Sequence, residues 1–293
     1  MTVIETAVPA KPDLRGAARA KRTMSRKRLI LAILGYLVAV VFILPYLEMI
    51  VSALRPKNEL LARNYLPHHF DWSNFTSLWS TGFGGSLGAS LEIAGGSTLL
   101  VLLVALPAGY YTARHRFRGR AVFLLLVLAT QMFQPAAMLV GIQREFTSFN
   151  LPSPILSLIL VNAGFNMAFA VWILNAYFSS IPVELEQAAM VDGTSQLGAV
   201  ARITLPLAAP GIVTAVIFTF ISAWNELLVA LTLSGGSGSR TPLTVTINNY
   251  IGQYSIDWGH LFAASVIATI PVIVLFAFIE GKVVGGLTAG SIK

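Results

Sequence analysis

The four histidines of this chain are its best candidates for acid–base or metal chemistry, but their positions argue against both roles. They stand at positions 68, 69, 115 and 260, and only the first two are adjacent. The adjacent pair has no third ligand near it, and no His-Glu-x-x-His pattern occurs in the sequence. We therefore expect structural or solvated roles for all four histidines and no metal site.

Other reactive groups are also missing from the sequence. The chain has no cysteine, which excludes a catalytic thiol and a thiolate metal site. It has no Gly-x-x-x-x-Gly-Lys-Ser/Thr phosphate-binding loop, and no nucleophile is accompanied by a base and an orienting group. We expect that this chain is not an enzyme and holds no cofactor of its own.

The most unusual stretch is a polar segment between two long apolar runs. It extends from residue 181 to residue 207, with the sequence IPVELEQAAMVDGTSQLGAVARITLPL. Pro182 suits a first helical position, and Glu184 and Glu186 would follow in the first turn, where the helix dipole favours anions. We expect this loop to form two short helices.

The second half of the loop carries further helix signals. Gly193 can end the first helix, and Thr194 or Ser195 can cap the second, which Pro206 and Pro210 are expected to end. Small residues, which let another backbone approach closely, are frequent here: Ala188, Ala189, Gly193, Gly198, Ala199 and Ala201. The loop is therefore either a docking surface for another protein or an interfacial helix pair packed on its own spans.

The composition around this loop is that of a membrane protein. Apolar residues make up 55% of the chain and charged residues 11%, whereas soluble domains carry about 25% charged residues. A helix of about 20 apolar residues crosses the hydrocarbon core, and six such runs occur, at about 29–51, 87–111, 121–142, 155–176, 210–233 and 260–280. The first run is too long for the core of a signal peptide. The sequence predicts an all-α integral membrane protein with six transmembrane helices.

The basic residues predict how the chain is oriented. Fifteen of the 20 Lys and Arg residues fall in the N-terminal tail, the 112–120 and 178–208 connections and the C-terminus. Because cytoplasmic segments are enriched in Lys and Arg, both termini and the 181–207 loop are predicted to be cytoplasmic. This distribution explains the net charge of +7 without a nucleic-acid partner.

The orientation divides the chain into three parts: an N-terminal tail, a membrane domain and a C-terminal tail. Residues 1–28 contain eight Lys or Arg and no aromatic residue, and we expect a flexible basic cytoplasmic tail. Residues 29–284 are expected to form the six-helix transmembrane domain, and residues 285–293 a cytoplasmic C-terminal tail.

The 181–207 loop resembles a known family motif. Glu186-Gln-Ala-Ala-Met-Val-Asp-Gly193, followed by Ile203-Thr-Leu-Pro206, is similar to the EAA loop of permeases of binding-protein-dependent ABC importers, which docks on an ATP-binding subunit. The resemblance assigns this coupling role to Glu186, Gln187, Ala188, Ala189, Asp192, Gly193, Arg202 and Pro206. The family's Glu before Ala-Ala is Gln187 here, so its carboxylate is either supplied by Glu186 or dispensable.

The resemblance extends from about residue 29 to the end and indicates the carbohydrate-uptake branch, which includes the maltose-type permeases. Its other motifs are Asn74-Phe75 with Trp79, Tyr110-Tyr-Thr-Ala-Arg114, Phe117-Arg-Gly-Arg120, Trp224-Asn-Glu226, Trp258-Gly259 and Gly286-Leu-Thr-Ala-Gly290. In the maltose-type subunit a similar tail reaches between the two ATPase subunits. The resemblance therefore implies ATPase contacts for Gly286, Leu287, Thr288, Ala289 and Gly290.

The family implies a permease subunit that moves a sugar or sugar derivative across the bacterial cytoplasmic (inner) membrane. Its implied partners are membrane lipid, a second permease subunit in a heterodimer, two subunits that bind ATP and Mg, and an extracytoplasmic sugar-binding protein. Two alternatives are an ABC importer permease for a non-sugar solute and an ion-coupled secondary transporter. The second would be expected to show an inverted repeat, which we do not find.

Polar residues inside apolar spans are costly and are candidates for a translocation path. They are Gln131, Gln134, Asn162, Asn166, Asn225 and Glu226, with Trp224 as an aromatic ring that could stack on a sugar. The alternative for these residues is hydrogen bonding between helices. The aromatic residues at 72, 79, 250, 254 and 258 suit either a binding-protein surface or an interfacial aromatic belt.

Overall fold

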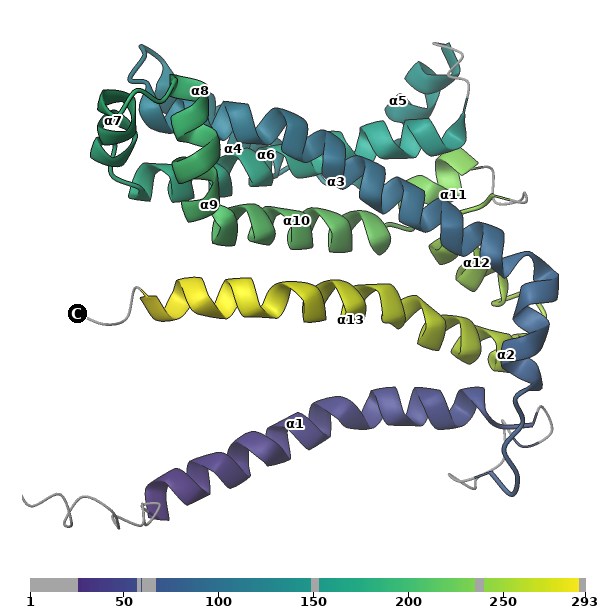
Figure 1. Ribbon diagram of the computed structural model, residues 1–293. Coiled ribbons are helices and arrows are strands. Elements are labelled where there is room, and N and C mark those ends of the chain that lie inside the picture. The colour runs from purple at the N-terminus through teal and green to yellow at the C-terminus, as the bar shows by residue number, and fades with distance from the viewer. Residues whose placement is uncertain (1–25, 57–58, 60–66, 149–152, 235–239, 290–293) are drawn as a thin grey trace, which may run out of the picture. The chain divides into compact units, whose positions relative to one another are not determined.

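The computed structural model describes residues 26–56, 59, 67–148, 153–234 and 240–289, and Figure 1 shows its helices. Residues 1–48 and 49–293 form two separately defined units, so α1 (Arg26–Ala53), which crosses this boundary, is described by itself. It contains an apolar stretch long enough to cross a membrane, Leu29–Ala53. The tail expected at 1–28 lies outside the described residues up to position 25, and its last three residues begin α1.

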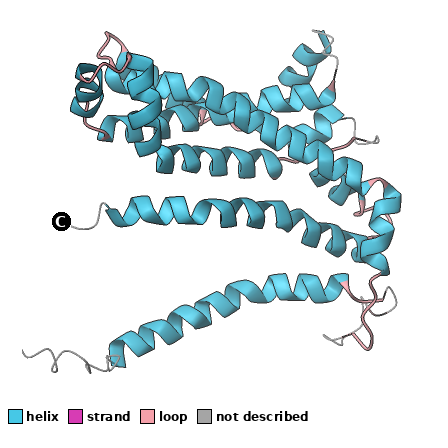
Figure 2. Cartoon of the chain, viewed as in Figure 1, coloured by secondary structure: helices cyan, strands magenta, loops and turns pink. Residues whose placement is uncertain are grey.

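The described residues are helical apart from turns, loops and one isolated β-bridge between Ile251 and Ile256 (Figure 2). The elements after α1 are α2 (Ser73–Leu78), η1 (Trp79–Thr81), α3 (Phe83–Arg114), α4 (Arg120–Thr130), α5 (Pro135–Ser148), α6 (Pro154–Ser180), α7 (Glu184–Val191), α8 (Gln196–Ala199), the π-helix η2 (Val200–Thr204), α9 (Leu205–Leu207), α10 (Ala209–Trp224), α11 (Leu228–Ser234), α12 (Leu243–Asn249) and α13 (Trp258–Ala289).

Four helices in the described residues are long and apolar enough to cross a membrane on their own. They are Leu29–Ala53, Phe83–Arg114, Pro154–Ser180 and Trp258–Ile279. Two further pairs of helices pass the same test only when each pair is counted as one bent span. The expected spans at 29–51, 87–111, 155–176 and 260–280 therefore coincide with continuous helices.

The expected span at 121–142 is broken in the structure. The helices α4 and α5 meet at 91°, and residues 131–134 between them are not helical. Pro135 explains the break, because proline has no N–H to donate and disfavours helical backbone in the residue before it.

The expected span at 210–233 is also two helices. Helix α10 has 16 residues and covers roughly 24 Å, which is less than the hydrocarbon core of about 30 Å. Glu226 marks the restart of the chain as α11, because its two carboxylate oxygens accept the N–H groups of Val229 and Ala230, each at 2.8 Å. The preceding bent pair, residues 196–207 with α10, is bent by 71°.

The 181–207 loop contains the two expected helical segments, α7 and a run from α8 to α9. Gly193 has φ +88°, the left-handed conformation that commonly ends a helix. Ser195 rather than Thr194 caps the second segment, since its hydroxyl accepts the N–H of Gly198 at 3.2 Å.

The two prolines of this loop do not act as expected. Pro182 lies two residues before the start of α7 rather than at its first position. Pro206 does not end the second segment, because the helix continues through it to Leu207. Pro206 directly follows the π-helix η2, so its ring does not face a regular α-helical turn.

A closely packed pair of helices, α3 and α6, forms the centre of the second unit. A Cβ atom added at Gly109 of α3 would lie 2.9 Å from the Cβ of Leu174 on α6, so glycine is needed where these backbones meet. Helix α10 packs against both, and α13 packs against α10, α2 and α12. In Figure 1, α7 and α8 lie at one end of this helical bundle and α2, α11 and α12 at the other.

Helix α13 extends further than the sequence suggested. It continues to Ala289, so residues 285–289 of the expected C-terminal tail are helical. Residues 290–293 lie outside the described residues.

Candidate functional site

A buried carboxylate joins the 181–207 loop to the rest of the chain. Oε1 of Glu186 in α7 accepts hydrogen bonds from Nε and Nη2 of Arg114, at 2.9 and 2.6 Å, and from Oγ1 of Thr204 at 2.7 Å. Its Oε2 accepts the hydroxyl proton of Tyr110 at 2.8 Å. Tyr110 and Arg114 are four residues apart on α3 and so share one face of that helix. One carboxylate therefore ties together α3, α7 and η2.

Arg114 extends this network to the end of α6. Its Nη1 donates to the carbonyl oxygens of Phe178 and Ile181, at 2.9 and 2.8 Å. The last carbonyl groups of a helix have no partner within the helix, and the guanidinium supplies one. The guanidinium carbon of Arg114, Cζ, lies 5.9 Å from the centre of the Tyr110 ring. Arg114 thus joins α3, α6 and α7, and Thr204 adds η2 to the same network.

Burial makes this network costly to disrupt. The Arg114 and Glu186 side chains are each 7% exposed. Burial alone would raise the pKa of Glu186, but hydrogen bonds from Thr204, Tyr110 and Arg114, with the charge of Arg114, hold this pKa below its ordinary value. Because the folded-state pKa is the lower one, the stabilisation is present above the ordinary carboxyl pKa and is lost as the pH falls through the lowered value.

Two further contacts support the α3–α6 side of the network. The Asn175 amide donates to Oγ1 of Thr112 at 2.8 Å, and both residues are buried. The rings of Tyr110 and Phe178 meet edge to face, with 5.8 Å between their centres and an interplanar angle of 89°. These contacts fix the rotamers around Arg114.

The loop exposes several apolar side chains. Val191 of α7 is 87% exposed and Leu197 of α8 is 82% exposed. Val183, Leu185 and Met190 are also exposed. Apolar side chains exposed to this degree are candidates for contact with a partner.

The residues assigned to coupling thus fall into two sets. Glu186 is buried, whereas the other seven are exposed or half-buried: Gln187, Ala188, Ala189, Asp192, Gly193, Arg202 and Pro206. The carboxylate of Glu186 is hydrogen-bonded within the chain. It therefore does not replace the carboxylate that the family motif has at the exposed position 187. The outward surface at position 187 is neutral.

The candidate translocation residues near the α4–α5 break lie around α6. Gln131 donates its side-chain amide to the Phe165 carbonyl at 2.9 Å, and Gln134 is exposed. Asn162 is buried and donates to the Leu158 carbonyl within its own helix at 2.9 Å. Asn166, one turn further, donates to the Asn162 carbonyl at 2.8 Å.

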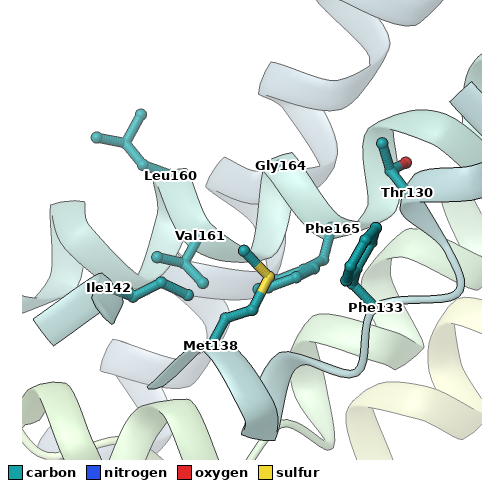
Figure 3. Close-up of a pocket in the computed structure, with 8 residues that line it drawn as sticks. All are labelled: Thr130, Phe133, Met138, Ile142, Leu160, Val161, Gly164 and Phe165. Atoms are coloured by element: carbon teal, nitrogen blue, oxygen red, sulfur yellow. The ribbon is translucent and has the colours of Figure 1, made fainter. Parts of the chain in front are cut away.

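A cavity of about 480 Å³ lies beside this break (Figure 3). Figure 3 shows Phe133, Met138 and Phe165 converging on it from three sides. The complete lining is Thr130, Phe133, Met138, Ile142, Leu160, Val161, Gly164 and Phe165. It is largely apolar.

The remaining candidates, at the α10–α11 break, have structural partners. The indole N–H of Trp224 is donated to the Ala268 carbonyl of α13 at 3.2 Å, and the ring is buried. Asn225 donates to the Ile221 carbonyl at 3.0 Å, and Glu226 caps α11. The Glu226 carbonyl also accepts the hydroxyl of Thr244 in α12 at 2.8 Å, so this group joins α10, α11, α12 and α13, whereas Gln131, Asn162 and Asn166 bond to α6.

The far end of the unit contains a chain of a serine, a histidine and an aspartate. His260 Nε2 lies 2.8 Å from Oγ of Ser77, and its Nδ1 lies 2.6 Å from Oδ2 of Asp257. The Ser77 hydroxyl donates to the Ser73 carbonyl at 2.5 Å, within its own helix. The arrangement is structural and does not activate a nucleophile.

The sequence analysis gave Tyr110, Arg114 and Thr204 no role as partners of Glu186. Two signals were present: the spacing of four between Tyr110 and Arg114 at the end of an apolar run, and the threonine inside the Ile203-Thr-Leu-Pro206 motif. Neither signal names Glu186 as the partner, because that contact spans 72 residues.

Comparison with known proteins places the loop and the helices in one family. Residues 105–283 match the family described as "Binding-protein-dependent transport system inner membrane component". The chain is 33% identical over 252 residues to the sulfoquinovosyl glycerol transport system permease protein SmoH of Agrobacterium fabrum, covering 85% of this chain and 88% of that protein. It is 32% identical over 272 residues to the trehalose/maltose transport system permease protein MalG of Thermococcus litoralis, with coverages of 91% and 97%.

A solved structure shows the same fold. It is that of a bacterial ABC transporter involved in the import of the acidic polysaccharide alginate, and it superimposes with a TM-score of 0.73. The match covers 88% of this chain and 98% of that chain, at 21% sequence identity. At this identity the likeness concerns the arrangement of helices.

We predict that the Arg114–Glu186 pair is a major source of stability. Replacing Arg114 by Met leaves a buried carboxylate uncompensated, which costs about 3–5 kcal/mol. Thermal unfolding of the purified protein in detergent should therefore show a clear loss for Arg114→Met. The matched control is Arg202→Met. It removes an exposed arginine of the 181–207 loop, which also contains Glu186, and this variant should unfold like the wild type. Equal melting temperatures for the two variants would contradict the role given to the pair.

Proposed function

The chain belongs to the family of inner membrane components of binding-protein-dependent transport systems, and we propose that it is the permease subunit of a sugar ABC importer. Its relatives are permease subunits, so the chain is a transport component and not an enzyme. The sugar assignment is supported by the printed functions of relatives, which include sulfoquinovosyl glycerol and trehalose/maltose transport. The observation that carries the coupling role is the loop with a buried carboxylate inside and an apolar face outside.

The proposed topology has six spans in the bacterial inner membrane. Four are continuous helices, the bent pair of α4 and α5 counts as one more, and α10 with α11 forms the sixth, since residues 196–207 of the other bent pair belong to the loop. Both termini and the 181–207 loop are placed in the cytoplasm, because that side then receives most of the Lys and Arg residues. The division into a basic tail at 1–28, a membrane domain at 29–284 and a C-terminal segment at 285–293 is part of the same proposal.

The 181–207 loop is proposed to dock on an ATP-binding subunit. Removing Val191 and Leu197 from water is favourable, by about 25 cal/mol for each Å² of apolar surface buried. The small side chain of Ala188 and the bare backbone of Gly193 let the partner come close. ATP-driven movement of the partner would then pass through Glu186 and Arg114 to α3 and α6, which would alternate between inward-facing and outward-facing arrangements.

The solute path is proposed to run beside the α4–α5 break. Non-helical backbone at membrane depth is tolerated only where it is buried in protein or lines a water-filled cavity. Residues 131–134 are non-helical and carry the exposed Gln131 and Gln134, whose amides can bond sugar hydroxyls. Asn162 and Asn166 lie on the adjacent helix α6. Trp224, Asn225 and Glu226 are proposed to shape the α10–α11 end of this path through their structural contacts.

The complete transporter is proposed to contain a second permease, two ATPase subunits and an extracytoplasmic sugar-binding protein. The ATPase subunits would bind ATP and Mg, for which this chain has no motif. The segment Gly286, Leu287, Thr288, Ala289 and Gly290 is proposed to contact them from the end of α13. The aromatic residues at the opposite end, including Tyr254, are available to the binding protein.

The docking proposal predicts a loss of assembly when a charge is placed on the exposed apolar face. Leu197→Glu should lower the amount of ATPase subunit that co-purifies with the chain at least tenfold, because an unpaired charge is costly in an interface. The control is Tyr254→Glu, an equally exposed position at the far end of the unit, which should retain the wild-type amount. Full co-purification with Leu197→Glu would argue against docking through this face.

The sugar proposal is tested by reconstituting the transporter in proteoliposomes with its binding protein. ATP hydrolysis should rise several-fold when the binding protein carries a saccharide, if the loaded form binds preferentially to the conformation that hydrolyses ATP. Binding protein loaded with an amino acid is the comparison. Stimulation by the amino-acid-loaded form alone would reassign the permease to a non-sugar solute.

A further inference from the structure

A second apolar groove lies at the end of the bundle that carries the 181–207 loop. It encloses about 680 Å³ between the outer face of α3, the turn at 115–119 and the start of α4. Its lining is almost wholly apolar: Leu103, Val104, Pro107, Ala108, Tyr111, Thr112, Phe117 and Phe123. Both α3 and α4 belong to proposed membrane spans, and the groove lies where α3 ends and α4 begins.

Basic side chains surround the surface end of this groove. Arg116 and Arg118 are exposed and Arg120 is half-buried, whereas Arg114 is committed to Glu186. None of the ion pairs found in the described part of the chain uses Arg116, Arg118 or Arg120. The sequence has no Asp or Glu from residue 93 to residue 144, so the local charge is not neutralised by neighbours along the chain.

The turn itself is held in a defined shape. The Tyr111 and His115 rings stack with their centres 4.4 Å apart, and Tyr111 lies 5.9 Å from Phe117. Gly119 has φ +92°, a conformation that favours glycine and sends the chain sharply into α4. The arginines are therefore presented beside the mouth of the groove by a structured turn.

We propose that this groove binds an anionic phospholipid of the cytoplasmic leaflet. One acyl chain would lie along Leu103 and Val104, and the phosphate would be held by the arginines of the turn. Charge complementarity selects this occupant: a zwitterionic lipid gains little from three cations, and an apolar helix of a partner would leave them without a counter-charge. The proposal uses the inferred orientation but not the identity of the transported solute.

The headgroup part of the proposal is tested on the complete purified transporter by native mass spectrometry. Phosphatidylglycerol should be retained at least fivefold more than phosphatidylcholine with the same acyl chains. Arg118→Gln should lower retention of phosphatidylglycerol about fivefold, since one basic residue near an anionic surface is worth roughly that factor. Arg144→Gln, which removes an exposed arginine of α5, should leave retention unchanged. Equal retention of the two lipids, or equal effects of the two variants, would overturn the proposal.

The acyl-chain part has its own test. Val104→Trp fills the groove without changing charge and should abolish the retention of phosphatidylglycerol while subunit composition and melting temperature stay at wild-type values. A photoreactive benzoylphenylalanine at position 117 reports on the occupant even if that variant folds poorly. It should cross-link to phospholipid in native membranes. Cross-linking to a protein subunit instead would show that a partner helix covers the groove and would refute the lipid site.

Discussion

A carboxylate buried beneath a surface loop has to be paired, and the pairing of Glu186 determines how this chain is organised at its loop end. Isolated in the interior, such a charge would cost several kcal/mol. Here it receives hydrogen bonds from Arg114, Tyr110 and Thr204. Since these donors belong to α3 and η2, and Arg114 also caps α6, the geometry of one carboxylate fixes four elements. The loop cannot tilt without moving α3 or breaking the ion pair.

This constraint separates two properties that a coupling element needs. Glu186 on the inner side of α7 is bonded within the chain, whereas Val191 of α7 and Leu197 of α8 are apolar and exposed. A partner can therefore bind the outer side without competing for the contacts on the inner side. Displacement at the outer side would then pass to α3 and α6, whose backbones approach closely at Gly109. An interface packed so tightly moves as a unit rather than deforming gradually.

The sequence predicted those features that depend on local chemistry. Gly193 and Ser195 end and begin helices because capping is decided within a few residues, and the long apolar runs at 87–111 and 155–176 are single helices. The breaks at 131–134 and 225–227 were missed because their polar residues, Gln131, Gln134, Asn225 and Glu226, were interpreted as candidates for a translocation path inside continuous spans. Pro135 and the carboxylate of Glu226 instead mark the starts of new helices. The pairing of Glu186 with Arg114 was out of reach for a different reason. Periodicity indicates which face of a helix is buried, but not which residue 72 positions away will meet it.

In the proposed mechanism the Glu186 network transmits force from the docking surface to the spans. The most direct measurement is the number of solute molecules transported per ATP hydrolysed, in proteoliposomes whose complexes contain the full set of subunits. Glu186→Gln keeps the shape of the side chain and the exposed docking face but removes the charge. With Glu186→Gln, assembly and ATP hydrolysis should persist while the number of solute molecules transported per ATP falls several-fold. Gln187→Glu, on the exposed side of α7, should not cause this loss. A Glu186→Gln transporter with the wild-type ratio would contradict the proposed mechanism.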